Sequence, residues 1–308
     1  MSEIQARTFE TIYQIAPEAA VKRLQGFRER VPARNIEIGK NIYPVWNIGE
    51  GERAAVFLPS GMGHGEVWFP YLTAIAPEIR VVALSLAVNK TIEGYCRDLH
   101  ALFERLGLKK VVLIAQAIGG LIAQSYVRLY PNEVEGMALC MCGAPAQGLP
   151  KGIQQKWVER KKLASKLFFA PFKVMRQRMA YQTFHGMCPP ELEDALSFWR
   201  AFIAETYEYA VYKKQYIALN CRAVPGIYAR LPYAPGDLNG WKGKTLLLEA
   251  ENDQYYPDEE KALLRALYPH AQLATLGKGG QLALLAEERE GSRILLDFLR
   301  GLREGEGA

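Results

Sequence analysis

One short stretch of the chain has the spacing of a nucleophile turn but lacks the nucleophile. The sequence AQAIGG (115–120) lies between a run rich in Val and Leu and a helical stretch. Nucleophile elbows of the form G-x-S-x-G share this layout, with small residues two places on either side of the centre so that the tight turn can pack. The centre here is Ala117, whose methyl group cannot attack a carbonyl carbon. The pattern therefore indicates a scaffold for acyl-transfer chemistry from which the reacting oxygen is missing.

The elements that would hold this turn alternate regularly along the chain. Continuous apolar runs, typical of strands buried on both faces of a parallel sheet, occupy residues 54–61, 81–86, 111–116, 137–142 and 245–250. Apolar residues at helical spacing predict helices over 91–106, 121–130 and 258–267. A helix over 7–30 and two alternating strands, 35–38 and 42–48, precede this pattern. We therefore predict an α/β fold with a mostly parallel central sheet and helices on both faces.

The alternation is interrupted once, which suggests an insertion. Residues 147–240 are helical and rich in aromatic residues, and the strand pattern resumes at Lys244. We therefore expect an N-terminal helical extension (1–34), a core built from residues 35–146 and 241–304, and an inserted helical cap (147–240).

The composition excludes several classes of protein. The chain has 308 residues, 49% hydrophobic and 23% charged, which is ordinary for a folded domain. No apolar run approaches the roughly 20 residues needed to cross a bilayer, and the polar start MSEIQARTFE is unlike a signal peptide, so we expect a cytoplasmic protein. Five cysteines without a CxxC pair indicate buried thiols, neither a disulfide framework nor a zinc site. We predict no cofactor and no nucleic-acid partner.

From about residue 36 to 300 the chain resembles the α/β-hydrolase superfamily. The loop LPSGMGHGEVW (58–68) stands where that family has its H-G-x-G oxyanion loop, with Pro-Ser in place of His-Gly. The resemblance implies that the backbone amides of Gly61 and Ile118 form the oxyanion hole. It also implies that LLLEAENDQYYP (246–257) presents the triad acid as Asp253, and that TLGKGGQLALL (275–285) carries Gln281 in place of the triad histidine.

The triad-equivalent residues are thus Ala117, Asp253 and Gln281, and two of the three chemical roles are missing. A glutamine amide accepts no proton near neutral pH, so it cannot activate a nucleophile. A narrower resemblance points the same way: IALNC (217–221), YPHA (268–271) and GKGGQ (277–281) are similar to the maspardin-like branch. That branch has asparagine in place of the histidine but keeps the elbow serine, and it implies a non-hydrolytic binding or adaptor role.

The four histidines offer little to replace the triad. We place His64, in the oxyanion-loop segment, and His185, in the cap, near the pocket, whereas His100 and His270 suit structural or solvated positions. No pair of histidines has HxxxH spacing, so no metal centre is expected. The residues expected around the pocket are Ser60, Met62, His64, Gln116 and His185.

The net charge of +5 is concentrated in one segment. Residues 151–180 hold nine basic residues and one acid, interleaved with aromatic and aliphatic residues. This pattern fits a cap with solvated cations, a surface that attracts an anionic membrane or an acidic partner, or a cationic ceiling over a pocket for an acyl or carboxylate ligand. The residues considered for the membrane contact are Lys156, Arg160, Lys161, Lys162 and Lys166.

These patterns favour one functional hypothesis and leave two alternatives. The favoured one is a catalytically inactive hydrolase relative that binds a small apolar or acyl ligand, or a protein partner, through the former active-site cleft. The first alternative is an enzyme of the same fold that uses Asp253, His64 or His185 as acid or base, or a serine hydrolase variant whose nucleophile has been removed. The second is a peripheral membrane or scaffold protein that acts through the basic cap.

Overall fold

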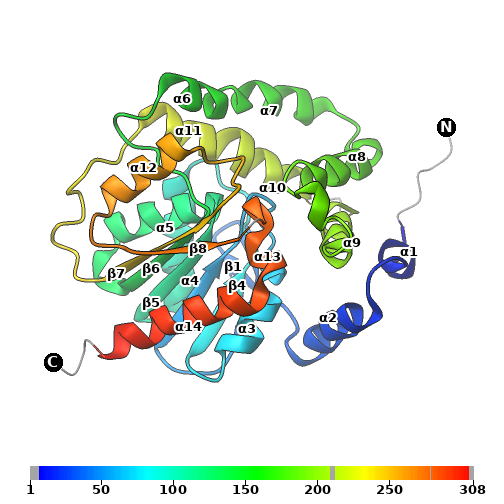
Figure 1. The fold of residues 1–308 in the computed structure, drawn as a ribbon, viewed down its shortest axis with the longest axis horizontal. Helices are drawn as coiled ribbons and strands as arrows, with labels where there is room; N and C mark the ends of the chain where they lie inside the picture. Colours follow the sequence, from blue (N-terminus) through cyan, green and yellow to red (C-terminus); the bar gives the residue numbers. More distant parts are fainter. Residues whose placement is uncertain (1–6, 209–211, 278, 305–308) are drawn as a thin grey trace.

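A computed structural model of the chain describes residues 7–208, 212–277 and 279–304. Residues 1–6 of the predicted extension, 209–211 of the predicted cap and Lys278 of the GKGGQ motif lie outside the described residues. One central sheet of eight strands has helices on both faces, and a further group of helices covers one side of this layer (Figure 1). The predicted fold class is therefore confirmed.

The strands follow the order β1-β2-β4-β3-β5-β6-β7-β8. β2 is antiparallel to both of its neighbours, and the pairs from β4 to β8 are parallel. Successive residues of a central strand pack on opposite faces, Ala54 and Val56 on one and Ala55 and Phe57 on the other, which explains the continuous apolar runs. The bounds are β1 (Arg34–Ile38), β2 (Asn41–Ile48), β3 (Arg53–Leu58), β4 (Arg80–Leu84), β5 (Lys110–Gln116), β6 (Val134–Cys140), β7 (Lys244–Ala250) and β8 (Gln272–Leu276).

Helices cover both faces of the sheet. One face packs against α3 (Phe69–Ile75) and α14 (Glu288–Glu304), which follows the single turn α13 (Ala283–Ala286). The other face packs against α4 (Ile92–Arg105), α5 (Ile118–Leu129) and α12 (Asp258–Leu267). The helix predicted over 121–130 thus begins three residues earlier, directly after Ala117. Within the residues that the structure describes, no helix combines the length and the apolar character that a membrane crossing requires.

The cap helices lie between β6 and β7 and occupy the upper part of Figure 1. Pro171 separates α7 from α8, because proline lacks a backbone N–H and its ring blocks the preceding turn. A π-helical turn, Leu219–Ala223, joins α10 to α11, and such irregular turns are frequent at functional sites. The bounds are α6 (Lys151–Val158), α7 (Arg160–Phe169), α8 (Phe172–His185), α9 (Ser197–Glu208), α10 (Tyr212–Ala218) and α11 (Val224–Arg230).

The N-terminal segment folds as two helices, so the prediction of a single helix over residues 7–30 is wrong. The first helix, α1 (Phe9–Tyr13), begins after Thr8, whose hydroxyl accepts a hydrogen bond from the Thr11 amide (3.3 Å). The second, α2 (Glu18–Arg30), begins after Pro17. Proline provides no N–H and disfavours helical geometry in the residue before it, so the helix is interrupted before Pro17. The apolar spacing alone does not show this break. α1 packs against α9 of the cap.

Candidate functional site

The elbow is present in the structure with an alanine at its centre. Ala117 joins β5 to α5 with φ 49° and ψ −112°, a backbone conformation that residues other than glycine rarely adopt. Its amide donates to the Cys140 carbonyl (2.9 Å). A Cβ on Gly119 would lie 2.6 Å from the Pro59 carbonyl oxygen, so the turn requires a glycine two places after its centre. The backbone thus has the strain of a nucleophile turn, while the side chain has no nucleophilic atom.

The Asp253 carboxylate and the Gln281 amide are hydrogen-bonded to each other. Gln281 Nε2 donates to Asp253 Oδ2 (2.6 Å), and Asp253 Oδ1 accepts from the amides of Tyr255 (2.8 Å) and Tyr256 (3.2 Å). Gln281 is buried, and its backbone carbonyl accepts from Gln116 Nε2 (2.7 Å). Three donors therefore hold the Asp253 carboxylate, and the side chain at position 281 gives it a hydrogen bond without being able to take up a proton.

Gly61 and Ile118 lie beside each other next to the elbow. A Cβ on Gly61 would be 3.2 Å from Ile118 Cδ1. Ile118 is the first residue of α5, so its N–H has no acceptor within the helix. The cap fixes the loop of Gly61, because Asn220 Nδ2 in the π-helical turn donates to the Gly61 carbonyl (2.7 Å). The structure thus places Gly61 and Ile118, the residues whose amides the resemblance assigns to an oxyanion hole, next to each other.

These residues surround a cavity of about 90 Å³, which we call the cleft. Ser60, Met62 and Gln116 line it, as expected, together with Gly61, Ala117, Ile118 and Gln281. The cap contributes lining residues that we did not predict, among them the polar side chains of Arg160 and Asn220. Asn220 lies within the IALNC motif, which was a usable signal, whereas nothing in the sequence distinguishes Arg160 from its basic neighbours. The remaining wall is largely aromatic and includes Trp157, Tyr207, Tyr216, Tyr255 and Tyr256.

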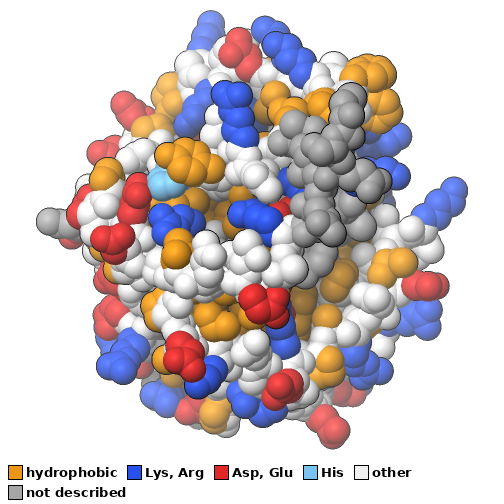
Figure 2. Space-filling model, turned by 90° about the vertical axis from the view of Figure 1, so that its right-hand side faces the viewer, with side chains coloured by type: hydrophobic (Ala, Val, Ile, Leu, Met, Phe, Trp, Pro, Cys, Tyr) orange, Lys and Arg blue, Asp and Glu red, His pale blue; other side chains and the backbone are white. Residues whose placement is uncertain are grey.

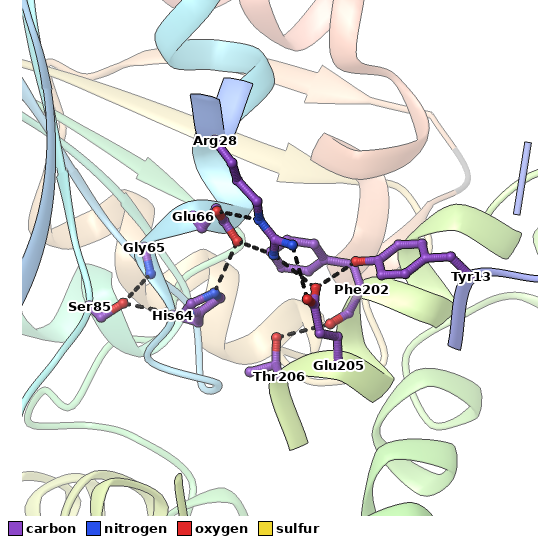
Figure 3. A network of polar contacts seen from close by, with 9 residues as sticks. All are labelled: Tyr13, Arg28, His64, Gly65, Glu66, Ser85, Phe202, Glu205 and Thr206. Atoms are coloured by element: carbon purple, nitrogen blue, oxygen red, sulfur yellow. Dashed lines mark hydrogen bonds and ion pairs between the residues drawn. The ribbon is translucent and has the colours of Figure 1, made fainter. Parts of the chain in front are cut away.

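His64 does not line the cleft, contrary to our expectation. Its Nδ1 lies 3.2 Å from Ser85 Oγ and its Nε2 lies 3.5 Å from Glu66 Oε2 (Figure 3). The imidazole packs between the rings of Trp46 and Phe202. The oxyanion-loop segment therefore carries this histidine away from the elbow, toward a buried carboxylate.

His185, which we expected near the pocket, does not line the cleft either. Its Nδ1 contacts Glu193 Oε1 (2.7 Å), and its ring lies 3.9 Å from the ring centroid of Tyr181, which is exposed. Across the described residues, no group of three or more His, Cys, Asp or Glu side chains is placed to hold a metal ion. Neither imidazole is thus part of the wall that Ala117 and Gln281 share.

A buried network around Arg28 connects the N-terminal helices, the core and the cap (Figure 3). Arg28 of α2 donates to Glu66 Oε1 (2.9 Å) and to Glu205 Oε1 of α9 (2.9 Å), and the Tyr13 hydroxyl donates to Glu205 Oε2 (2.7 Å). Burial raises the pKa of the Glu66 carboxyl, but hydrogen bonds from Arg28 and His64 outweigh it and lower that pKa from 4.5 to about 2. We call Tyr13, Arg28, His64, Glu66 and Glu205 the Arg28 network.

A second buried carboxyl, Glu260, stands behind the aromatic wall of the cleft. Its Oε1 accepts from the Ala144 amide (3.1 Å) and from the Tyr228 hydroxyl (2.5 Å). The Tyr228 ring stacks on Trp157, a cleft residue, at a centroid distance of 5.1 Å. Burial raises the pKa of Glu260 to about 7, although both hydrogen bonds act to lower it. This carboxyl therefore titrates near neutral pH.

The basic residues of the cap fall into two groups. Arg160 turns toward the cleft, with its guanidinium 4.6 Å from the Trp157 ring centroid. Lys156 is exposed and does not line the cleft, and its amino group donates to the Tyr255 carbonyl (3.2 Å). Lys161, Lys162 and Lys166 are exposed as well. Arg160 thus faces the cleft, whereas these four lysines face the surface, and the membrane contact considered from the sequence stays a prediction.

Comparisons with known proteins agree with this architecture. The model of the α/β hydrolase fold family matches residues 56–288, and the chain belongs to that family. No curated protein sequence matches the chain significantly.

Solved structures similar to this chain include several esterases and lactonases. A malate-bound thermophilic esterase from Thermogutta terrifontis shares 19% identity, with 88% of this chain and 99% of that chain covered and a TM-score of 0.68. The enol-lactonase from Burkholderia xenovorans LB400 shares 17%, covers 87% and 100%, and has a TM-score of 0.70. A carboxylesterase from Bacillus subtilis shares 16%, covers 92% and 98%, and has a TM-score of 0.68. At these identities the likeness establishes a common fold.

Proposed function

We propose that this chain is a non-hydrolytic member of the α/β hydrolase fold family that binds a small ligand in the cleft. One observation carries the proposal: Gln281 Nε2 donates to Asp253 Oδ2 at 2.6 Å, next to an elbow whose central residue is Ala117. Hydrolysis through an acyl-enzyme needs an attacking oxygen and a group that removes its proton. Here the position of the base is occupied by an amide that is already fixed as a donor to the acid.

The binding elements of the cleft are retained although the reacting groups are not. Gly61 and Ile118 lie beside each other, and Asn220 of the cap donates to the Gly61 carbonyl. Such preorganised donors bind an oxygen of a ligand whether or not a reaction follows. The competing hypothesis, an enzyme with substitute groups, has to rely on Asp253, His64 or His185, and none of the three lines the cleft.

The test is restoration of the missing groups. We would measure hydrolysis of p-nitrophenyl butyrate by the unaltered chain, by Ala117→Ser, by Gln281→His, and by the double variant. We expect hydrolysis only from the double variant, at least about a hundredfold above the unaltered chain, because general-base assistance commonly contributes that much. A fluorophosphonate probe followed by intact-mass measurement would report directly whether the new hydroxyl at position 117 reacts.

Two outcomes would contradict the proposal. Turnover by the unaltered chain that Asp253→Asn abolishes would show an enzyme that uses other groups. Silence from all four proteins, without labelling of the double variant, would show that the cleft no longer admits an ester.

A second candidate function rests on the outer face of α7. Phe168 and Phe169 are 60% and 84% exposed, and Leu163 is 40% exposed. Lys213 fixes the turn that presents them by donating to the carbonyls of Phe168 (3.0 Å) and Ala170 (2.7 Å). Basic and hydrophobic side chains are intermixed along the upper edge of Figure 2, where α6 and α7 lie. Exposed aromatic rings beside lysines fit the interface of an anionic membrane.

Co-sedimentation with vesicles tests this second candidate. We expect binding to phosphatidylcholine vesicles that contain roughly one third phosphatidylserine, and a loss of about fivefold per lysine removed, as in Lys166→Ala. Phe169→Ser should weaken binding as well, whereas Leu273→Ser, an exposed leucine on β8 (54%), serves as the matched control. Equal binding to neutral vesicles, or equal loss in the control, would remove the membrane hypothesis.

Two finer parts of the sequence interpretation belong to the same proposal. Similarity to the maspardin-like branch supports a binding role and rests on IALNC, YPHA and GKGGQ. A cytoplasmic location is consistent with five cysteines that are all free and buried.

A further inference from the structure

The wall of the cleft carries one charge in the part of the chain that the structure describes. Arg160 is that charge, and no carboxylate lines the cleft beside it. The Asp253 carboxylate, at the triad-acid position, already accepts hydrogen bonds from Gln281, Tyr255 and Tyr256. Arg160 itself forms its described hydrogen bond with a neutral amide, Asn220. A wall of this kind favours a ligand of negative charge.

Contacts on two sides hold Arg160 in place. Its Nη1 donates to Asn220 Oδ1 (3.3 Å), and its guanidinium lies over the Trp157 ring at 4.6 Å. The other end of the same Asn220 amide donates to the Gly61 carbonyl (2.7 Å). Asn220 therefore connects the only cation of the described wall to the loop of the oxyanion-hole amides. Its position in a π-helical turn, which costs regular helix geometry, is consistent with a role in the site.

We propose that the cleft binds a small carboxylate, with its negative charge facing Arg160; this inference rests on the binding function proposed above. A guanidinium offers five N–H donors in a planar fork that matches a carboxylate, and the described contacts use one of its nitrogen atoms. The aromatic side chains around it, Trp157, Tyr216 and Tyr255, suit a short apolar chain. The cavity of about 90 Å³ suits a chain of a few carbons.

Calorimetric titration of sodium butyrate against butanamide, at constant ionic strength, tests the proposal. The two probes have nearly the same size and shape, and only butyrate is charged. We expect the unaltered chain to bind butyrate at least about tenfold more tightly than butanamide, because a hydrogen bond between two charged groups is stronger than one to a neutral amide. Arg160→Met should remove that preference. Lys161→Met, which removes an exposed cation from the same helix, should leave it within about twofold.

The outcomes separate this inference from the proposed function. Equal affinity for butyrate and butanamide would overturn the carboxylate proposal and leave ligand binding in place. An unchanged preference in Arg160→Met would also overturn it. Absence of butyrate binding up to about 10 mM would overturn it too, and the proposed function would fail with it only if the double variant of Ala117 and Gln281 is also silent. If Arg160→Met is unstable, Arg160→Lys, which keeps the charge without the fork, should show an intermediate preference.

Discussion

Two buried glutamates of this protein are in opposite electrostatic situations. Glu66 is 5% exposed and paired with Arg28, which together with His64 lowers its pKa to about 2. Glu260 is 0% exposed and accepts hydrogen bonds from the Ala144 amide and the Tyr228 hydroxyl, and burial raises its pKa to about 7 although these donors lower it. Burial of similar extent therefore gives a permanent charge at one position and a proton-dependent one at the other.

The difference follows from where each carboxyl lies. Glu66 is at the joint between the N-terminal helices, the core and the cap, where an arginine also reaches Glu205. Glu260 is behind the aromatic wall of the cleft, where Tyr228 and Trp157 stack. The Arg28 network is thus held by ion pairs, whereas Glu260 accepts hydrogen bonds from neutral groups. This leaves Arg160 as the only charge on the described cleft wall.

The largest loss of folding stability should come from removing Arg28, the arginine at the centre of the Arg28 network. Arg28→Met leaves the buried carboxylates of Glu66 and Glu205 without their partner, and breaking such a pair typically costs about 3–5 kcal/mol. Urea denaturation at pH 7 measures this loss. Adding Glu66→Gln and Glu205→Gln to the variant should restore much of the stability, because no uncompensated charge is left.

Arg23 provides the matched control for this experiment. It lies on the same helix and pairs with Glu288 (2.8 Å), but its side chain is 49% exposed. Arg23→Met should cost no more than about 1 kcal/mol. Similar losses of stability for Arg28→Met and Arg23→Met would mean that water solvates the charges of the Arg28 network. Glu66 would then not be a buried, permanently charged counterpart to Glu260.

The next largest effect should be a loss of folding stability at acid pH, when Glu66 in the Arg28 network becomes protonated. The folded pKa of Glu66, about 2, lies below its ordinary value of 4.5, so its contribution is complete above 4.5 and is lost as the pH falls through about 2. That shift corresponds to about 3 kcal/mol. We expect Glu66→Gln to lose less stability than the unaltered chain between pH 5 and pH 2.5, as measured by urea midpoints. Glu259→Gln, an exposed glutamate, should follow the unaltered chain.

Glu260 should have the opposite pH dependence, because raising the pH should lower the stability of the folded chain through its ionisation. The folded pKa of Glu260, about 7, lies above 4.5, so the cost of burying its charge appears above pH 4.5 and is complete once the pH exceeds about 7. Glu260→Gln keeps an oxygen for Ala144 and Tyr228 and carries no charge. It should be more stable than the unaltered chain by about 3 kcal/mol at pH 8.5, and by less than about 1 kcal/mol at pH 5. A constant difference across this range would show that Glu260 does not titrate there.

The fold was largely predictable because its central strands are buried on both faces. Such strands appear as continuous apolar runs, and the runs over 111–116 and 245–250 correspond to β5 and β7. The N-terminal helix was predicted incorrectly although Pro17 is a visible signal. Apolar spacing persists through that proline since both helices pack on the same core.

The candidate site was predictable where backbone spacing decides position. Ala117 follows from the elbow pattern, and the facing pair of Asp253 and Gln281 follows from the family resemblance. Side-chain direction was not predictable: His64 lies in the oxyanion-loop segment (58–68), but its ring contacts Glu66, Trp46 and Phe202 and does not line the cleft. Arg160 differs from Lys161 only in how α7 packs, which a single sequence does not specify.

The smallest effect should come from the backbone of the elbow. Ala117 has φ 49° and ψ −112°, a conformation that costs about 1–3 kcal/mol in residues other than glycine. The cleft therefore contains backbone strain, whereas the Arg28 network contains buried charge. Ala117→Gly should relieve this strain, partly offset by the greater entropy that glycine loses on folding, for a net gain of about 1 kcal/mol. Ala123→Gly, inside α5, should instead lose about 1 kcal/mol or more. Urea midpoints that shift in the same direction for both variants would show that the elbow is unstrained.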